Sequence, residues 1–306
     1  MSDNDQNRSD KQWSGKTGGT KWMQQSLIGM FRHINPVLVY PIICIWILFY
    51  IAFGHAGRRG IWHYWCLRTP ANMPSLIRWC WRVKNLYLNY LEFGKVIMDR
   101  FAAYSGRKIH VTIKGEEILN KLNNEPGGFI VLSTHLGNQE LAGYTFHMTK
   151  PMYVLVHVGD TETVNENRQQ AFEKMGLHVI PVRIDGSHVI SMHNALSEGN
   201  ILSIHADRLF FDTKATTAII LGEEAKYPEG PFRIAIAERV PVVTLFMMRE
   251  RASVYTLHVR LLSDGIYSEK RRDEKMKTLL TKYVAANEEI LQRYPHQWFH
   301  FYEFWK

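Results

Sequence analysis

One segment of the chain combines the residue types of a general base with a tight turn. It runs from Phe129 through His135, Gly137 and Asn138 to Glu140. The apolar start predicts a strand, the glycine and asparagine predict a turn, and Glu140 falls in the first turn of the next helix. A carboxylate that accepts from one ring N–H fixes a histidine's tautomer and raises the basicity of its other nitrogen. We interpret His135 and Glu140 as a candidate base and its orienter; the alternative is a buried structural histidine beside a helix cap.

Two later stretches add polar side chains to the same predicted edge. Asp207 and Arg208 directly follow an apolar strand at Ile201–His205. Ligands of open α/β sheets bind beyond the carboxyl ends of the strands, so we expect this pair in the wall of the active site. The second stretch, residues 221–232, predicts a loop that leads into a helix at Gly230. Taken alone, each stretch is also compatible with a solvated charged surface.

The elements that carry these residues alternate along the chain. Apolar strands are predicted at 108–113, 128–133, 152–158, 178–182, 201–205, 218–221, 242–248 and 253–261. Helical patterns fall between or after them, at 136–147, 166–175, 187–196, 230–238 and 272–293. This alternation predicts an α/β fold in which helices flank a largely parallel sheet, within a domain at residues 106–306.

Composition narrows the class of partner. The 306 residues include 37 Lys and Arg against 29 Asp and Glu, which gives a net charge of +8. Such a balance favours an anionic partner, and the 9 Trp, 14 Tyr and 15 Phe favour a membrane interface. The three cysteines, Cys44, Cys66 and Cys80, cannot make a disulfide framework and lack metal-ligand spacing. We expect no metal site.

The N-terminal third predicts contact with a membrane. After a polar tail at 1–32, residues 33–57 hold no Asp, Glu, Lys or Arg, and Val37–Phe53 is almost wholly apolar. A spanning helix needs about 20 apolar residues, so one membrane crossing is expected; the alternative is a buried core helix. Residues 58–105 are basic and aromatic, with a long helix at Ser75–Tyr104. That helix would lie on an anionic membrane surface or pack on the domain.

Together these motifs resemble a known family, the bacterial lipid A biosynthesis acyltransferases of the lysophospholipid acyltransferase superfamily. The resemblance rests on a His-x4-Glu pattern with Gly-Asn inside it, an Asp-Arg pair after a strand, a Leu-Gly…Ala…Pro-x-Gly-Pro-Phe loop and a Pro-x-Gln-Trp ending. These patterns are met by His135, Gly137, Asn138, Glu140, Asp207, Arg208, Leu221, Gly222, Ala225, Pro228, Gly230, Pro231, Phe232, Pro295, Gln297 and Trp298. The family usually carries Asp-Gln-Asp where this chain has His205-Ala206-Asp207.

The resemblance implies transfer of a fatty acyl group from acyl carrier protein or coenzyme A to a hydroxyl or amine of a lipid acceptor. His135 would remove the acceptor's proton while Glu140 stabilises the imidazolium. Backbone N–H groups near Gly137 and Asn138, or the Arg208 guanidinium, would bind the oxyanion. Asp207 and Gly230 would also belong to the substrate-binding site. No cofactor beyond the thioester is expected. The resemblance also implies a single-pass protein of the bacterial inner membrane, with its catalytic domain in the cytoplasm.

Three alternatives stay open at this stage. The first is an acyltransferase whose acceptor is a phospholipid or aminolipid instead of lipid A. Outside enzymes, the same fold serves as a membrane-anchored scaffold without catalysis, because fold does not imply function. Nucleic-acid binding is disfavoured, since the basic residues are dispersed and no reader motif is present.

Overall fold

The protein is an α/β domain with a helical layer on one flank. The structure, a computed structural model, describes residues 21–53, 57–145, 149–157, 172, 176–183, 185–209, 213–268 and 271–305. A seven-stranded sheet has the order β1-β9-β8-β2-β5-β3-β4. All its neighbouring strands are parallel except β8 and β9. The predicted α/β fold with a mostly parallel sheet is therefore confirmed.

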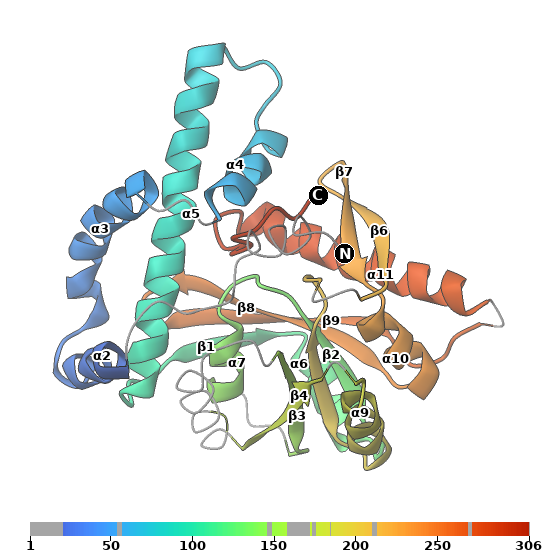
Figure 1. The fold of residues 1–306 in the computed structure, drawn as a ribbon. Coiled ribbons are helices and arrows are strands. Elements are labelled where there is room, and N and C mark those ends of the chain that lie inside the picture. Colours follow the sequence, from blue (N-terminus) through green and yellow to red (C-terminus); the bar gives the residue numbers. More distant parts are fainter. Residues whose placement is uncertain are drawn as a thin grey trace.

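The strands of this sheet lie close to their predicted positions. They are β1 (His110–Lys114), β2 (Phe129–Ser133), β3 (Met152–His157), β4 (Leu177–Val182), β5 (Ile201–His205), β8 (Val242–Arg251) and β9 (Val254–Ser263). A separate antiparallel hairpin consists of β6 (Ala215–Ile220) and β7 (Glu223–Pro228). The helices of the domain are α6 (Glu116–Asn124), α7 (Gln139–Thr145), α9 (His188–Ser197), α10 (Gly230–Glu238) and α11 (Arg272–Arg293) (Figure 1).

The sheet is apolar on both faces, as central parallel strands require. All five residues of β2 are buried. Ile130 and Leu132 join the larger core cluster, which includes residues of α9, α10 and α11. Phe129 and Val131 join the smaller cluster, which includes residues of α6. Because successive side chains of β2 pack into different clusters, the strand cannot slip by one residue. The residues that follow its carboxyl end therefore have a defined position.

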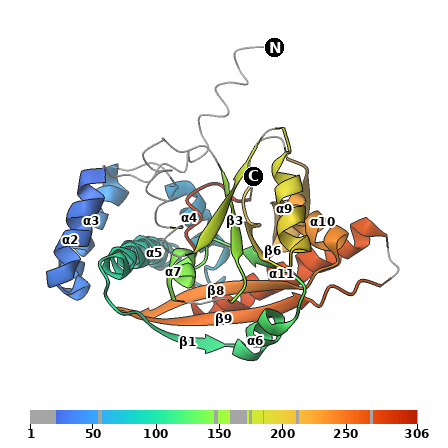
Figure 2. The ribbon, with the colours of Figure 1, turned by 90° about the horizontal axis from the view of Figure 1, so that it is seen from below.

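The N-terminal region forms a layer of helices beside the sheet. It contains α2 (Lys21–His33), the 3-10 helix η1 (Pro36–Val39), α3 (Tyr40–Phe53), α4 (Arg58–Leu67) and the long α5 (Ser75–Tyr104). Figures 1 and 2 show α5 between the α2–α3 pair and the sheet. In the described part of the chain, one segment, Pro36–Phe53, is long and apolar enough to cross a membrane, with a mean hydropathy of 2.3.

Three expectations about elements need correction or stay open. Helix α2 occupies residues that the sequence assigned to the polar tail. Its Phe31 is fully buried against α5, but the mostly polar composition of residues 1–32 gave no sign of this single contact. Strand β7 replaces an expected loop, and α6 was not expected. Both are short and rich in charge, and each buries only two or three side chains, so the sequence offers little apolar length to identify them. The helix expected at 166–175 lies outside the described residues, apart from Phe172.

Candidate active site

The register of two neighbouring strands brings the chemistry together. Strands β2 and β5 are parallel, with Ser133 opposite His205. The backbone N–H of Ala206 donates to the carbonyl of Ser133 at 3.0 Å, so the pairing continues past the end of both strands. The two residues after Ser133 therefore run beside the residues after His205. This places His135 next to Asp207, although 72 residues separate them in the chain.

Asp207 holds His135 through both its ring and its backbone. The Nδ1 atom of His135 lies 2.9 Å from Oδ1 and 3.0 Å from Oδ2 of Asp207. The same carboxylate accepts from the His135 backbone N–H at 2.8 Å and from the Thr134 hydroxyl at 3.0 Å. Asp207 is 2% exposed, whereas the His135 side chain is 26% exposed. A buried carboxylate thus fixes one edge of a ring that solvent and substrate can still reach.

The charge around Asp207 keeps the carboxylate ionised. Burial by itself would raise the pKa of Asp207. The neighbouring His135, Arg208 and His205 outweigh burial and hold this pKa well below its usual value. An ionised carboxylate only accepts, so Nδ1 of His135 carries the proton and donates it to Asp207. The lone pair of the neutral ring is then on Nε2, the position from which a histidine acts as a general base.

Glu140, the expected orienter, is engaged with a different group. Its carboxylate forms an ion pair with the guanidinium of Arg100, which comes from α5. The two side chains are 24% and 21% exposed. The orienting position on Nδ1 of His135 thus belongs to Asp207, which the sequence had placed only in the wall. The physical reason is the turn between His135 and α7, because it directs the first turn of that helix toward α5.

That turn depends on Gly137. Its φ is +69°, and a Cβ at this position would lie 2.2 Å from the carbonyl oxygen of Met247. The Gly137 N–H donates to the carbonyl of Gln297, and the Asn138 N–H donates to that of Met247, both at 2.8 Å. Both N–H groups predicted for an oxyanion hole are therefore already committed to carbonyls. Gly137 and Asn138 shape the turn beside His135, and Arg208 stays a prediction as an oxyanion donor.

The C-terminal segment closes the site from the other side. The Phe299 N–H donates to the carbonyl of His135 at 3.0 Å. Arg208 Nη2 donates to the carbonyl of Phe299 at 3.4 Å, and its guanidinium lies over the ring of Tyr302. The Tyr302 hydroxyl donates to the backbone carbonyl of Asp207. One segment near the end of the chain therefore contacts the backbone of both His135 and Asp207.

One comparison with known proteins shows the family of the chain. A family model described as bacterial lipid A biosynthesis acyltransferase matches residues 84–306, nearly three quarters of the chain. The chain belongs to this acyltransferase family. The match begins within α5, so α2, α3 and α4 lie outside it. Comparison with curated proteins gives no significant match.

Within this acyltransferase, the sequence interpretation missed two residues at the site. His205 lies beside His135, with their ring centroids 4.7 Å apart. Arg100 pairs with Glu140, and this ion pair raises the pKa of Arg100 against the opposing effect of burial. His205 ends a predicted strand, as Asp207 nearly does, so its position was available as a signal. Arg100 gives no such signal, because only the fold brings α5 to α7.

Gly230 stays a prediction as a substrate-binding residue. It begins α10, and a Cβ there would meet no atom within 4 Å. The helix that it begins does support the site indirectly. Phe232 packs on the ring of Tyr283, whose hydroxyl donates to the Ser133 carbonyl at 2.9 Å. Among the described residues, no group of three His, Cys, Asp or Glu side chains is arranged to hold a metal ion.

Proposed function

We propose that the protein transfers a fatty acyl group from an acyl thioester, carried by acyl carrier protein or coenzyme A, to a hydroxyl or amine of a lipid acceptor. Membership of the family supports acyl transfer to a lipid. The observation that supports the mechanism most directly is the hydrogen bond between His135 Nδ1 and the buried, ionised Asp207. This pair leaves Nε2 as a base at the carboxyl edge of the sheet.

In the proposed mechanism, His135 Nε2 takes the proton of the acceptor as its oxygen or nitrogen attacks the thioester carbonyl. The ring becomes an imidazolium, which the Asp207 carboxylate stabilises. The tetrahedral intermediate then collapses, and the carbon–sulfur bond breaks. The departing thiolate takes the proton from Nε2, so the ring returns neutral. General-base catalysis of this kind contributes about 10²–10⁴-fold.

Arg208 is the proposed electrostatic partner of the tetrahedral intermediate. It follows Asp207 directly, and its guanidinium is held between the Phe299 carbonyl and the Tyr302 ring. Burial lowers the pKa of Arg208, against the opposing effect of Asp207, yet an arginine side chain stays protonated at any working pH. A fixed cation in a site that excludes water stabilises developing negative charge more strongly than one in solvent.

An apolar cavity beside the C-terminal segment offers room for a lipid chain. Its volume is about 650 Å³, and its lining comes from the end of α3, from α4, from α5 and from the C-terminal segment. Apolar side chains of Trp62, Val83, Leu86 and Phe304 contribute to its walls. The cavity is also lined by polar side chains, two of them arginines: Arg58, Arg59, His63 and Glu303. We assign this cavity to an acyl chain of the acceptor, whose phosphate or carboxylate the arginines would bind.

The proposed location is the bacterial inner membrane, with the α/β domain on the cytoplasmic side. Acyl thioesters are cytoplasmic, and an acceptor with fatty chains resides in the bilayer. An enzyme that joins the two must present its catalytic edge to water while it contacts lipid. The exposed apolar residues of α3 and of the start of α5 provide that contact.

The test of the proposed function is an acyl-transfer assay with the His135→Ala variant. The rate should fall at least about 10²-fold, as expected for loss of a general base, while folding and membrane association persist. A matched control is His193→Ala, which removes an exposed histidine that is paired with Glu238 on the surface. A His135→Ala variant that kept more than about a tenth of the wild-type rate would refute the base assignment. Lipid mass spectrometry of cells with and without the gene would identify the acceptor as lipid A, a phospholipid or an aminolipid.

A further inference from the structure

Helix α3 is apolar on every side, and its two faces differ in what covers them. The inner face, with Tyr40, Ile43 and Ile47, packs on α5. The outer face carries Ile42, Ile45, Trp46, Phe49 and Phe53, which are between 55% and 77% exposed. These outer residues recur at the spacing of one helix face. One side of the helix thus contacts the protein, but only 11% of the segment Pro36–Phe53 is buried, and the exposed remainder needs an apolar partner.

The packing of the inner face is specific along most of the helix. At Gly94 of α5, a Cβ would come within 2.9 Å of the Ile43 side chain, so the glycine lets the two helices approach closely. The Tyr87 hydroxyl donates to the carbonyl of Cys44 at 3.2 Å, and the rings of Tyr50 and Tyr90 lie 5.7 Å apart. Helix α3 is therefore fixed to α5 along its length, not merely joined to it by a loop.

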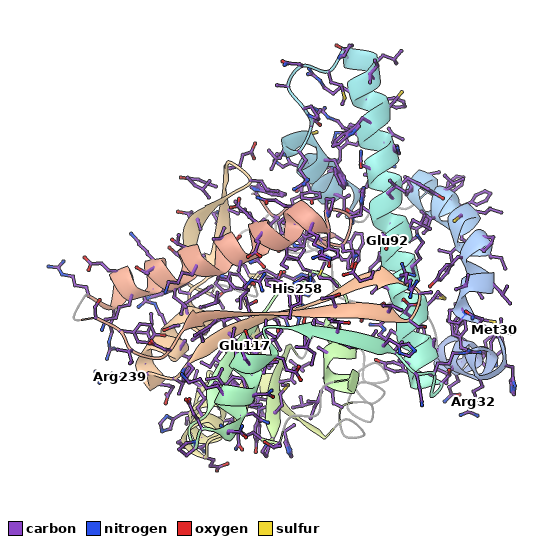
Figure 3. The ribbon with its side chains drawn as sticks, turned by 180° about the vertical axis from the view of Figure 1, so that it is seen from behind. Met30, Arg32, Glu92, Glu117, Arg239 and His258 are labelled. Atoms are coloured by element: carbon purple, nitrogen blue, oxygen red, sulfur yellow. The ribbon has the colours of Figure 1, made fainter. Side chains whose placement is uncertain are left out.

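A polar network ties this helix pair to the sheet. The Tyr40 hydroxyl donates to Asp99 and accepts from Arg249, both at 2.9 Å. Asp99 is fully buried, and Arg249 also forms ion pairs with Asp99 and Glu92 (Figure 3 labels Glu92 on α5). If α3 crossed a bilayer, these charged side chains would lie within its hydrocarbon region. Ionised side chains at that depth are costly, and they are rare outside pores and pathways.

Both ends of α3 are also held by the same body. On the N-terminal side, Phe31 of α2 is buried against Phe101 and Ala102 of α5. On the C-terminal side, Arg58 of α4 donates to the carbonyl of Ile51 at 3.0 Å. The hydroxyl of Tyr64, also on α4, donates to the carbonyl of Pro295 at 2.8 Å. A helix that crosses a membrane leaves one end on the far side, and here the helices on both sides pack on one domain.

We infer that α3 does not cross the bilayer: it lies against α5 with its outer face inserted into one leaflet, and both of its ends stay on the side of the α/β domain. The length of Pro36–Phe53, about 27 Å as a helix, and its hydropathy predicted a crossing, but neither property records what the inner face packs on. The inference rests on the proposed membrane association and does not depend on acyl transfer.

The occupant of the outer face is an anionic lipid leaflet. Of the twenty-two large apolar side chains that are exposed in the described residues, sixteen fall between Trp22 and Val83. Basic residues stand at both ends of the apolar stretch: Arg32 and His33 before it, Arg58 and Arg59 after it. Figure 3 shows Met30 and Arg32 together on α2, at the foot of this layer. Apolar insertion flanked by cations is the pattern of proteins that lie in the interface of anionic membranes.

Site-specific labelling of the full-length protein tests the topology. Cys44, Cys66 and Cys80 are replaced by alanine, and a single cysteine is introduced by Ser26→Cys on α2 or by Ser268→Cys in the exposed loop after β9. Spheroplasts are treated with a membrane-impermeant maleimide before and after lysis. The inference expects the same result at both positions: protected in intact spheroplasts and labelled after lysis. Labelling of one position but not of the other in intact spheroplasts would overturn it.

A second experiment tests the occupant of the outer face. The Trp46→Asp/Phe49→Asp variant should lose at least about tenfold in partitioning to vesicles of phosphatidylglycerol and phosphatidylethanolamine. The matched control, Ile190→Asp/Ile266→Asp, changes two apolar side chains of the α/β domain that are 66% and 81% exposed, and it should bind as the wild type does. Unchanged vesicle binding of the α3 variant would overturn the inference. So would a loss of self-association by that variant without a loss of binding, because the face would then belong to a second copy of the chain.

Discussion

Two carboxylates near His135 differ in almost every physical respect. Asp207 follows the neighbouring strand, is 2% exposed, and accepts hydrogen bonds from the ring, the backbone and the adjacent threonine. Glu140 lies five residues along the chain, is about a quarter exposed, and pairs with Arg100 of α5. The residue that is near in sequence is thus tied to the helical layer, and the residue that is distant in sequence is tied to the base.

The difference shows how a sheet edge organises chemistry. Parallel strands bring residues at equivalent register positions together whatever their separation in sequence, and β2 and β5 do so here. A helix that follows a glycine turn takes its direction from that turn. We therefore expect Asp207 to control the protonation of His135, and Glu140 to control the position of α5 relative to the site.

The largest effect should come from Asp207→Asn. The amide cannot favour the imidazolium and accepts poorly from Nδ1, so the wrong tautomer is populated and the rate should fall about 10²–10⁴-fold. The melting temperature should fall too, since the amide NH2 group would face donors that the carboxylate accepts from, so rates are compared at a temperature where both proteins are folded. Asp273→Asn, at an exposed ion pair with Arg233, is the matched control. Near-normal rates for Asp207→Asn would place Asp207 outside the catalytic pair.

Glu140→Gln should lower the acyl-transfer rate by a smaller factor. A double-mutant cycle with Arg100→Gln tests whether Glu140 acts through Arg100. If Glu140 acts through Arg100, each single variant should lose activity, and the double variant should lose little more than either one. The coupling should be about 0.5–3 kcal/mol in transition-state stabilisation. Additive losses would show instead that Glu140 acts on the reaction without Arg100, as the sequence pattern alone had predicted.

Gly137→Ala should act on folding instead of on the reaction, because it disturbs the turn that separates the two carboxylates. The added Cβ would collide with the Met247 carbonyl, and the left-handed backbone disfavours alanine, so we expect a loss of about 1–3 kcal/mol in unfolding free energy. Thermal unfolding measures it. Gly127→Ala is the control, because a Cβ there would meet nothing within 4 Å. Equal melting temperatures for the two variants would contradict the described turn.

Much of the fold was predictable from the sequence because it depends on local patterns. The apolar strands and the helices at Ser75–Tyr104, Gly230–Glu238 and Arg272–Arg293 occur where their periodicity placed them. The position of His135 was predictable as well, since a histidine after a buried strand must emerge at the sheet edge. Chain order alone cannot give strand register, and register decides that Asp207 meets Nδ1 of His135.

The membrane segment illustrates the same limit. Hydropathy identified the apolar helix, but hydropathy is a property of the segment and records none of its contacts. The glycine at position 94 and the buried Asp99, both on another helix, determine how α3 is held. Neither residue stands out in the sequence, because a single glycine or aspartate occurs within helices for many different structural reasons.

The most direct test of the central claim, that Asp207 and not Glu140 orients the base, is the proton NMR signal of the His135 ring. A ring N–H that donates to a buried carboxylate exchanges slowly and resonates far downfield, and histidine ¹⁵N labelling with a His135→Gln variant assigns it. We predict that the Nδ1–H signal is present in the wild-type protein, persists in Glu140→Gln and is lost in Asp207→Asn. A signal that survived in Asp207→Asn and vanished in Glu140→Gln would contradict the account.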